Sequence, residues 1–81
     1  MELRHLRYFT TAVLEGSVTK AAKRLNIAQP PLSRQLKQLG EEVGIPLLES
    51  GSRPLRTTDA GRFFHEKALV LLSQKAAVMP G

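Results

Sequence analysis

The sequence contains no cysteine among its 81 residues. That absence excludes disulfide bonds, thiolate metal sites and thiol nucleophiles, and it fits a reducing compartment. Long apolar runs are also missing, since no stretch approaches the roughly 18 to 20 residues that span a bilayer. The early charges of "MELRHLRYF" do not match a secretory signal. We therefore expect a soluble, cytoplasmic domain that does not contact a membrane.

Acidic side chains are outnumbered by basic ones. The chain has 12 Lys and Arg against 7 Asp and Glu, which gives a formal net charge of +5. A chain of this length forms one small domain and buries only about two-thirds of the surface of its unfolded form. The core is therefore small, and a partner subunit would stabilise it.

Apolar residues recur with helical spacing over residues 3–15, which predicts a first helix that ends at Gly16. Ser17 is a good N-cap for a short second helix over residues 18–25. Asn26 suits the left-handed position of a tight turn. Three residues, "NIA", therefore separate the second helix from the third.

The segment "QPPLSRQLKQL", residues 29–39, is expected to form a helix that begins at its prolines, because proline in a first helical turn removes no intrahelical hydrogen bond. Leu32, Leu36 and Leu39 make a narrow stripe for burial. Gly40 should weaken the end of this helix, and Gly44 should stop it. The arc opposite the leucines carries Pro30, Ser33, Arg34 and Lys37.

Two short segments, residues 47–49 and 55–57, flank a turn rich in Ser, Gly and Pro. This pattern predicts a small β-hairpin with Arg53 at its tip.

A last helix is expected over residues 59–77, with Thr58 as its cap and Asp59 at the positive end of its dipole. Its apolar residues cover more than half of its circumference, which is too wide an arc for one small domain to bury. We therefore expect a second copy of the chain to cover part of this helix, and residues 78–81 to form a tail. The residues expected at the dimer contact are Phe63, Phe64, Leu69, Leu71 and Leu72.

Two helices joined by a three-residue turn and followed by a hairpin have the layout of a winged helix-turn-helix, which is mainly α. This predicts a DNA-binding domain over residues 1–58 and a linker helix for dimerisation over residues 59–77. A helix of about ten residues fits the major groove, and the hairpin tip would reach the adjacent minor groove. The expected base contacts are Gln29, Pro30, Pro31, Ser33 and Arg34; the expected wing contacts are Arg53 and Pro54; the expected phosphate contacts are Thr19, Lys20 and Lys37.

Other chemistry has little support in the sequence. His5 and His65 have no further ligand at metal spacing, and the serines have no His/Asp pair to activate them. We therefore expect no enzyme, no metal and no cofactor. A basic arc on a helix is often only a solvated face. Two alternatives stay open: a basic helical dimer that binds an acidic protein partner and, with less support, an amphipathic membrane-binding module.

Four stretches carry a family resemblance: "MELRHLRYF", "AAKRLNIAQPPLSRQLKQL", "GIPLLE" and "SRPLRTTDAGRFF". Together they resemble the N-terminal DNA-binding domain of LysR-type transcriptional regulators. Because "AQPPLSRQ" and "SRP" occur together, the chain is most similar to regulators of aromatic-compound catabolism of the catechol, benzoate and chlorocatechol type. The resemblance covers about residues 1–75.

The resemblance implies a winged helix-turn-helix whose linker helix pairs with a second chain, and a tetramer in the full-length protein. It also implies a C-terminal domain that binds a small aromatic-derived inducer and that lies outside this sequence. Members of the family bind promoter DNA at an interrupted inverted repeat, and they typically activate a divergent operon and repress themselves.

The family's base-reading positions correspond to Gln29, Pro30, Pro31, Ser33 and Arg34, and its wing contacts correspond to Arg53 and Pro54. Two residues depart from the family pattern. Ser50 stands where an arginine is usual, which removes the phosphate or ion-pair role expected there. Gly40 stands where a helix-favouring residue is common, which bears on the length of the recognition helix.

Overall fold

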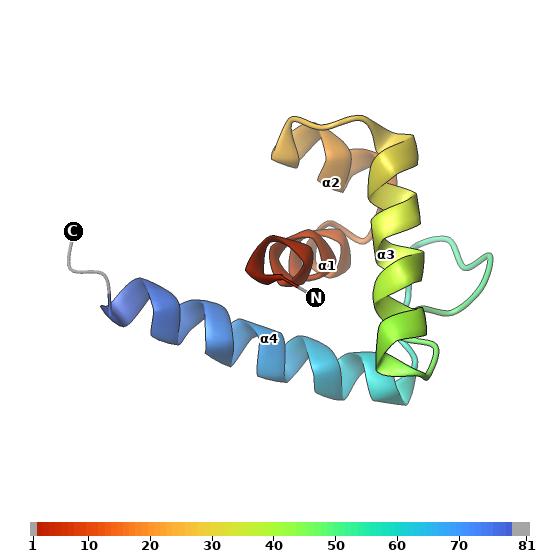
Figure 1. Cartoon of the computed structure of the whole chain (residues 1–81). Coiled ribbons are helices and arrows are strands. Elements are labelled where there is room, and N and C mark those ends of the chain that lie inside the picture. Colours follow the sequence, from red (N-terminus) through yellow and green to blue (C-terminus); the bar gives the residue numbers. More distant parts are fainter. Residues whose placement is uncertain (1, 79–81) are drawn as a thin grey trace.

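The computed structural model describes residues 2–78, and the side chains of residues 2–74. Four helices follow one another in the chain: α1 (Leu3–Glu15), α2 (Val18–Leu25), α3 (Gln29–Val43) and α4 (Asp59–Val78). Figure 1 shows α1 at the centre, with α2 and α3 on two sides of it and α4 running past the third. The mainly α fold and the predicted order of helices are confirmed. Val78 belongs to α4, and the rest of the predicted tail lies outside the described residues.

The turns around α2 form as the sequence predicts. Gly16 closes α1 with a φ of 68°, in the left-handed region. The Ser17 hydroxyl accepts a hydrogen bond of 3.2 Å from the backbone N–H of Lys20, which satisfies one of the free donors at the start of α2. Asn26 ends α2 with a φ of 59°. These local bonds set the direction of α2 relative to α1 and of α3 relative to α2.

Helix α3 begins at its prolines and continues past Gly40 to Val43, where Gly44 ends it with a φ of 89°. The stop predicted at Gly44 is confirmed, and the recognition segment expected over residues 29–39 is the first part of this longer helix. Glycine disfavours a helix by only about 1 kcal/mol. Here the Gly44 N–H donates to the Gly40 carbonyl oxygen at 2.9 Å, and the chain turns back so that Leu47 enters the core, only 3% exposed. This tertiary packing offsets the low propensity of Gly40.

The segment between α3 and α4 forms a protruding loop, residues 45–58, which we call the wing (Figure 1). Its two arms share one antiparallel bridge, Leu48 to Thr57, and the Glu49 N–H donates to the Arg56 carbonyl oxygen at 2.9 Å. The predicted strands 47–49 and 55–57 are thus reduced to a single bridge. The reason is Ser52, whose hydroxyl donates to the Glu49 carbonyl oxygen and accepts from the Arg56 N–H, so a side chain replaces the next rungs of the ladder.

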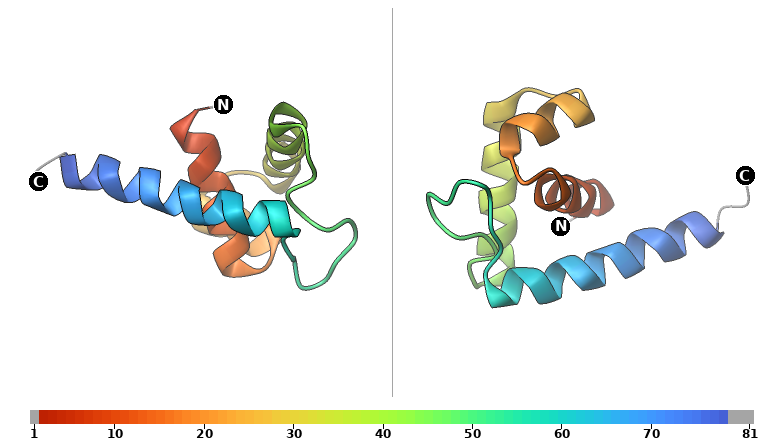
Figure 2. Two further views of the ribbon diagram at one scale, coloured as in Figure 1. Left: turned by 90° about the horizontal axis from the view of Figure 1, so that it is seen from below. Right: turned by 180° about the vertical axis from the view of Figure 1, so that it is seen from behind.

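The core lies where α1 meets the other helices. Phe9, Leu32 and Leu39 are its largest fully buried side chains. The ring of Phe64 from α4 packs edge-on against Phe9, with ring centres 5.3 Å apart, an arrangement that aromatic pairs favour. Figure 2 shows that the second half of α4 extends away from the other helices.

The start of α4 is fastened to the wing. The Thr58 hydroxyl accepts from the Gly61 N–H at 3.0 Å, as predicted for a cap, and donates to the Pro46 carbonyl oxygen at 2.6 Å. The Thr58 N–H donates to the Leu47 carbonyl oxygen at 3.0 Å. No helix within residues 2–78 is long and apolar enough to cross a membrane.

Candidate nucleic-acid interface

The flank of α3 opposite the core is free within this chain. Leu32, Leu36 and Leu39 are buried, at 0%, 6% and 2% exposure. The side chains across the helix are exposed or half-buried: Gln29, Pro30, Arg34 and Lys37 are exposed, and Pro31 and Ser33 are half-buried. Figure 1 shows α3 along one edge of the domain. The buried leucine stripe therefore holds a polar and basic surface outward, as the sequence predicted.

Two of the predicted base-reading residues touch each other. The Gln29 side-chain amide donates a hydrogen bond of 2.8 Å to the hydroxyl oxygen of Ser33, one turn further along α3. The first turn of the helix has few backbone donors, because Pro30 and Pro31 have no N–H. The Gln29 side chain is therefore the main polar group at the tip of α3.

A small cleft brings together predicted contacts from three separate segments. It has a volume of about 360 Å³ and lies between the start of α2, the start of α3 and the tip of the wing. Thr19, Gln29, Arg53 and Pro54 all line it. The other lining residues were not among the predicted contacts. Ser52 and Leu55 are two of them, and their place depends on how the wing folds back. The cleft joins the predicted wing contacts to the helix-turn-helix in one surface.

The wing is bonded, next to its tip, to the turn between α1 and α2. The Leu55 N–H donates to the Gly16 carbonyl oxygen at 3.0 Å. This bond lies directly after Arg53 and Pro54, so it places the wing tip beside α2. Figure 2 shows the wing standing out from the body of the domain next to α3.

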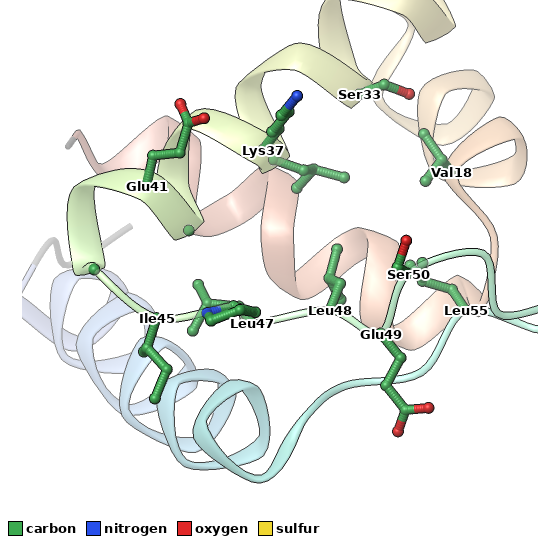
Figure 3. A pocket seen from close by; sticks show the side chains of 14 residues that line it. Val18, Ser33, Lys37, Glu41, Ile45, Leu47, Leu48, Glu49, Ser50 and Leu55 are labelled. Atoms are coloured by element: carbon green, nitrogen blue, oxygen red, sulfur yellow. The ribbon is translucent and has the colours of Figure 1, made fainter.

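A larger groove, with a volume of about 850 Å³, separates the second half of α3 from the wing. Its floor is apolar, formed by Val18, Leu36, Leu47, Leu48 and Leu55. Ser33 and Lys37 line it on the side of α3, and Ser50 lines it on the side of the wing (Figure 3). Glu41 and Glu49 also border the groove, so the surface becomes more acidic with distance from the tip of α3.

Some cationic side chains of the domain contact a carboxylate or an aromatic ring, whereas others are exposed to solvent. Arg24 forms an exposed ion pair with Glu15, at 2.8 Å. The Lys67 ammonium lies 5.2 Å from the centre of the Phe63 ring on α4. Lys20, Arg34, Lys37 and Arg53 are exposed. Charges of one sign gathered on one face attract the phosphates of DNA.

The described residues contain no group of three or more His, Cys, Asp or Glu that could hold a metal ion. His65 is half-buried and lies against Phe9, with ring centres 6.1 Å apart. Burial lowers the pKa of His65, although the nearby Glu66 carboxylate acts against that shift. His65 is a packing residue of the α1–α4 contact.

Helix α4 exposes several large apolar side chains, which are interspersed with the exposed charges of Arg62, Glu66 and Lys67. Phe63, Leu69, Val70 and Leu71 are 62%, 41%, 50% and 50% exposed. Phe64 is turned inward against Phe9, and Leu72 is half-buried. Of the five residues predicted for a dimer contact, Phe63, Leu69 and Leu71 are therefore free for a partner, whereas one ring face of Phe64 is used within the chain.

The family model described as "Bacterial regulatory helix-turn-helix protein, lysR family" matches residues 3–62, which include α1, α2, α3 and the wing. The chain belongs to the LysR family. Among its relatives, the HTH-type transcriptional regulator BenM of Acinetobacter baylyi is 64% identical over 73 residues, which are 90% of this chain and 24% of BenM. The probable cat1 operon transcriptional activator of Acinetobacter lwoffii is 55% identical over 74 residues, 91% of this chain and 24% of that protein.

Solved structures agree with the LysR assignment. This domain superposes on a BenM DNA-binding domain in complex with catB site 1 DNA with a TM-score of 0.93, at 60% identity, over 96% of this chain and 88% of that one. A complex of the CbnR DNA-binding domain with DNA gives a TM-score of 0.90 at 38% identity, over 96% of this chain and 90% of that one. The fold is thus the winged helix-turn-helix DNA-binding domain of LysR regulators. The LysR chain described here spans about a quarter of the length of its curated relatives.

Proposed function

We propose that this LysR domain binds a promoter duplex in a sequence-specific way, with α3 in the major groove and the wing in the adjacent minor groove. The observation that carries this proposal is the exposed flank of α3, next to the cleft where Thr19, Gln29, Arg53 and Pro54 meet. Those four residues come from three segments of the chain, and their convergence is what one continuous DNA footprint requires. The matched relatives include DNA-binding domains in complex with DNA.

The proposed roles follow from side-chain chemistry. Arg34 suits the O6 and N7 acceptors of guanine, and Gln29 suits the N6 and N7 groups of adenine. Pro30 and Pro31 offer apolar surface to a thymine methyl group, and Ser33 lies within the same surface. Thr19, Lys20 and Lys37 are placed to hold phosphates, which fix the position of the protein on DNA without reading its sequence. Arg53 and Pro54 would enter the minor groove, where arginine responds to groove width.

We further propose that residues 1–58 form the DNA-binding unit and that residues 59–77 pair two chains through the exposed face of α4. A pair with two-fold symmetry would place its recognition helices in successive major grooves, about 34–36 Å apart. Such a pair fits an interrupted inverted repeat. The apolar side chains of Phe63, Leu69 and Leu71 support this arrangement, because large apolar patches on a small domain mark interaction sites.

For the whole protein, we infer an inducer-responsive regulator of aromatic-compound catabolism that acts in the bacterial cytoplasm and has no catalytic role. It would carry a C-terminal inducer-binding domain, assemble as a tetramer, activate an operon and repress its own gene. Support comes from relatives that include BenM, the probable cat1 operon activator and the CatR regulator of Pseudomonas putida, which is 54% identical over 72 residues.

Titration of a labelled promoter duplex and a shuffled duplex of equal length, at two salt concentrations, tests the proposal. We expect tighter binding to the promoter and a steep linear fall of log affinity with log salt. Equal and weak binding to both duplexes would contradict the proposal and would favour the basic module that binds an acidic protein.

A further inference from the structure

The hydrogen bond between Gln29 and Ser33 joins two residues that would otherwise act separately at the proposed DNA surface. The Gln29 amide nitrogen lies 2.8 Å from the Ser33 hydroxyl oxygen and donates to it. Gln29 is exposed at the first position of α3, whereas Ser33 is half-buried one turn later. Ser33 therefore has the more restricted position of the two, next to the fully buried Leu32.

A glutamine at the start of this helix has little else to orient it. The preceding residue, Ala28, has no polar side chain, and the two following prolines have no backbone N–H. A free glutamine side chain also loses considerable rotamer freedom when it is fixed, at a cost of about 1.5–2 kcal/mol. A bond that orders Gln29 before DNA arrives removes part of that cost from binding.

The bond to Ser33 is also compatible with base reading by the Gln29 amide. A glutamine amide has one carbonyl oxygen and two N–H hydrogens. Adenine requires the oxygen and one N–H, side by side, to accept from N6 and donate to N7. The second N–H lies on the stem side of the amide. A glutamine that donates this second hydrogen to Ser33 can therefore still present its oxygen and its other N–H to adenine.

We propose that Ser33 is a positioning residue, which fixes the Gln29 amide for bidentate recognition of adenine, and that it does not itself select a base. This inference rests on the proposed function and adds how the amide that reads adenine is held in place. It predicts that loss of the Ser33 hydroxyl changes base preference at the position read by Gln29 and at no other position.

The test selects duplexes from a randomised library with the full 81-residue chain and compares the base preferences of variants. The set is Ser33→Ala, Ser33→Thr, Gln29→Ala and the double variant. We expect Ser33→Ala to lower the preference for adenine by about three- to tenfold, which is the range for one net hydrogen bond. Ser33→Thr keeps the hydroxyl and should retain the preference. In the double variant, Ser33→Ala should add no further loss to that of Gln29→Ala.

A chemical probe identifies the reading edge directly. In the duplex that the wild-type chain selects, 7-deazaadenine replaces the adenine and removes its N7 acceptor. We expect weaker binding by the wild-type chain and a smaller loss for Ser33→Ala, because the misplaced amide no longer donates fully to N7. Gln29→Ala should bind the adenine duplex and the 7-deazaadenine duplex with equal affinity. Gln38→Ala, an exposed glutamine on α3, and Ser73→Ala, an exposed serine on α4, are the matched controls and should bind as wild type.

Two results would overturn the inference while leaving the proposed function intact. One is that Ser33→Ala changes the preference at a base pair where Gln29→Ala has no effect, which would show that Ser33 itself reads a base. The other is full additivity of the two single variants, which would show that the residues act independently. If the wild-type chain selects no sequence, the proposed function fails, and this inference fails with it.

Discussion

The α-carbon of Gly61 passes so close to the carbonyl group of Leu47 that a β-carbon there would overlap the Leu47 oxygen. Gly61 is buried in the first turn of α4, and Leu47 is buried at the base of the wing. The helix can approach the wing this closely only because residue 61 has no side chain. This contact sets the direction in which α4 leaves the DNA-binding unit.

Gly61→Ala is therefore expected to destabilise the fold. The obstacle is backbone and cannot turn aside as a flexible side chain would, so we expect a loss of about 3 kcal/mol or more in the free energy of unfolding. Gly40→Ala is the matched control, because a β-carbon at Gly40 would lie 3.7 Å from its nearest neighbour, the Ile45 carbonyl oxygen. Inside a helix that change should stabilise by about 0.5–1 kcal/mol. Urea unfolding followed by circular dichroism measures both, and changes of the same sign would contradict this account.

Arg34 and Lys37 are expected to contribute to DNA binding in different ways. Arg34→Ala should weaken operator binding by about 1–3 kcal/mol and relax the choice at one base pair. Lys37→Ala should weaken binding to every sequence alike and reduce the salt slope by about 1. Fluorescence anisotropy on a set of single-base variants, at several salt concentrations, separates the two effects. An unchanged base preference in Arg34→Ala would show that Arg34 does not read the base.

The bond from Leu55 to Gly16 predicts a difference between two substitutions at one residue. Leu55→Pro and Leu55→Ala both shorten the apolar side chain, but proline alone removes the N–H that bonds the Gly16 carbonyl oxygen. We expect Leu55→Pro to weaken DNA binding by as much as Arg53→Ala does, because the wing tip loses its position beside α2. Leu55→Ala should keep most of the wing contribution. Equal affinities for the two Leu55 variants would show that the bond does not position the wing.

The exposed apolar side chains of α4 predict a concentration-dependent dimer. Leu71→Lys replaces one of them with a charge and removes apolar contact area, so it should weaken the dimer by about tenfold or more. Ser73→Lys adds the same charge at an exposed polar position on α4 and should have a smaller effect. Sedimentation velocity over a range of concentrations measures both. A dimer that resists Leu71→Lys would place the contact elsewhere on the chain.

The half-buried ring of His65 predicts that stability falls in mild acid. Burial lowers the pKa of His65 from its ordinary 6.5, so the unfolded chain binds a proton more readily than the folded one. The stability contributed by neutral His65 is complete above pH 6.5 and decreases as the pH falls below that value toward the lowered pKa. His65 Nδ1 is buried and has no hydrogen-bond partner within the described part of the chain, so His65→Gln should remove this dependence. The free energy of unfolding, measured at pH 7.5 and pH 5.5, tests this prediction. His5→Gln is the control, and it should retain the pH dependence.

Much of the helical part of this fold could be predicted from local chemistry. Ser17 and Asn26 act within two to four residues of themselves, so the sequence around them is enough to place α2. The spacing of Leu32, Leu36 and Leu39 likewise determines which flank of α3 stays outside. The exposed position of Arg34 follows from that spacing alone.

Features that depend on distant contacts could not be predicted in this way. Helix α3 passes through Gly40 because Leu47 enters the core beyond it. The wing has one bridge because Ser52 replaces backbone partners. Phe64 turns inward because Phe9 lies opposite it on α1. For α3 and Phe64 the deciding partner belongs to another element. For the wing, Ser52 bonds both arms of an irregular loop, and no helical or strand pattern in the sequence indicates that geometry.

The anchorage of the wing also has a consequence for how such domains diversify. Its tip is tied to the α1–α2 turn through the main-chain groups of Leu55 and Gly16. Main-chain groups persist through most substitutions. Residues at the tip can therefore be exchanged, by evolution or by an engineer, without shifting the wing relative to α2 and α3.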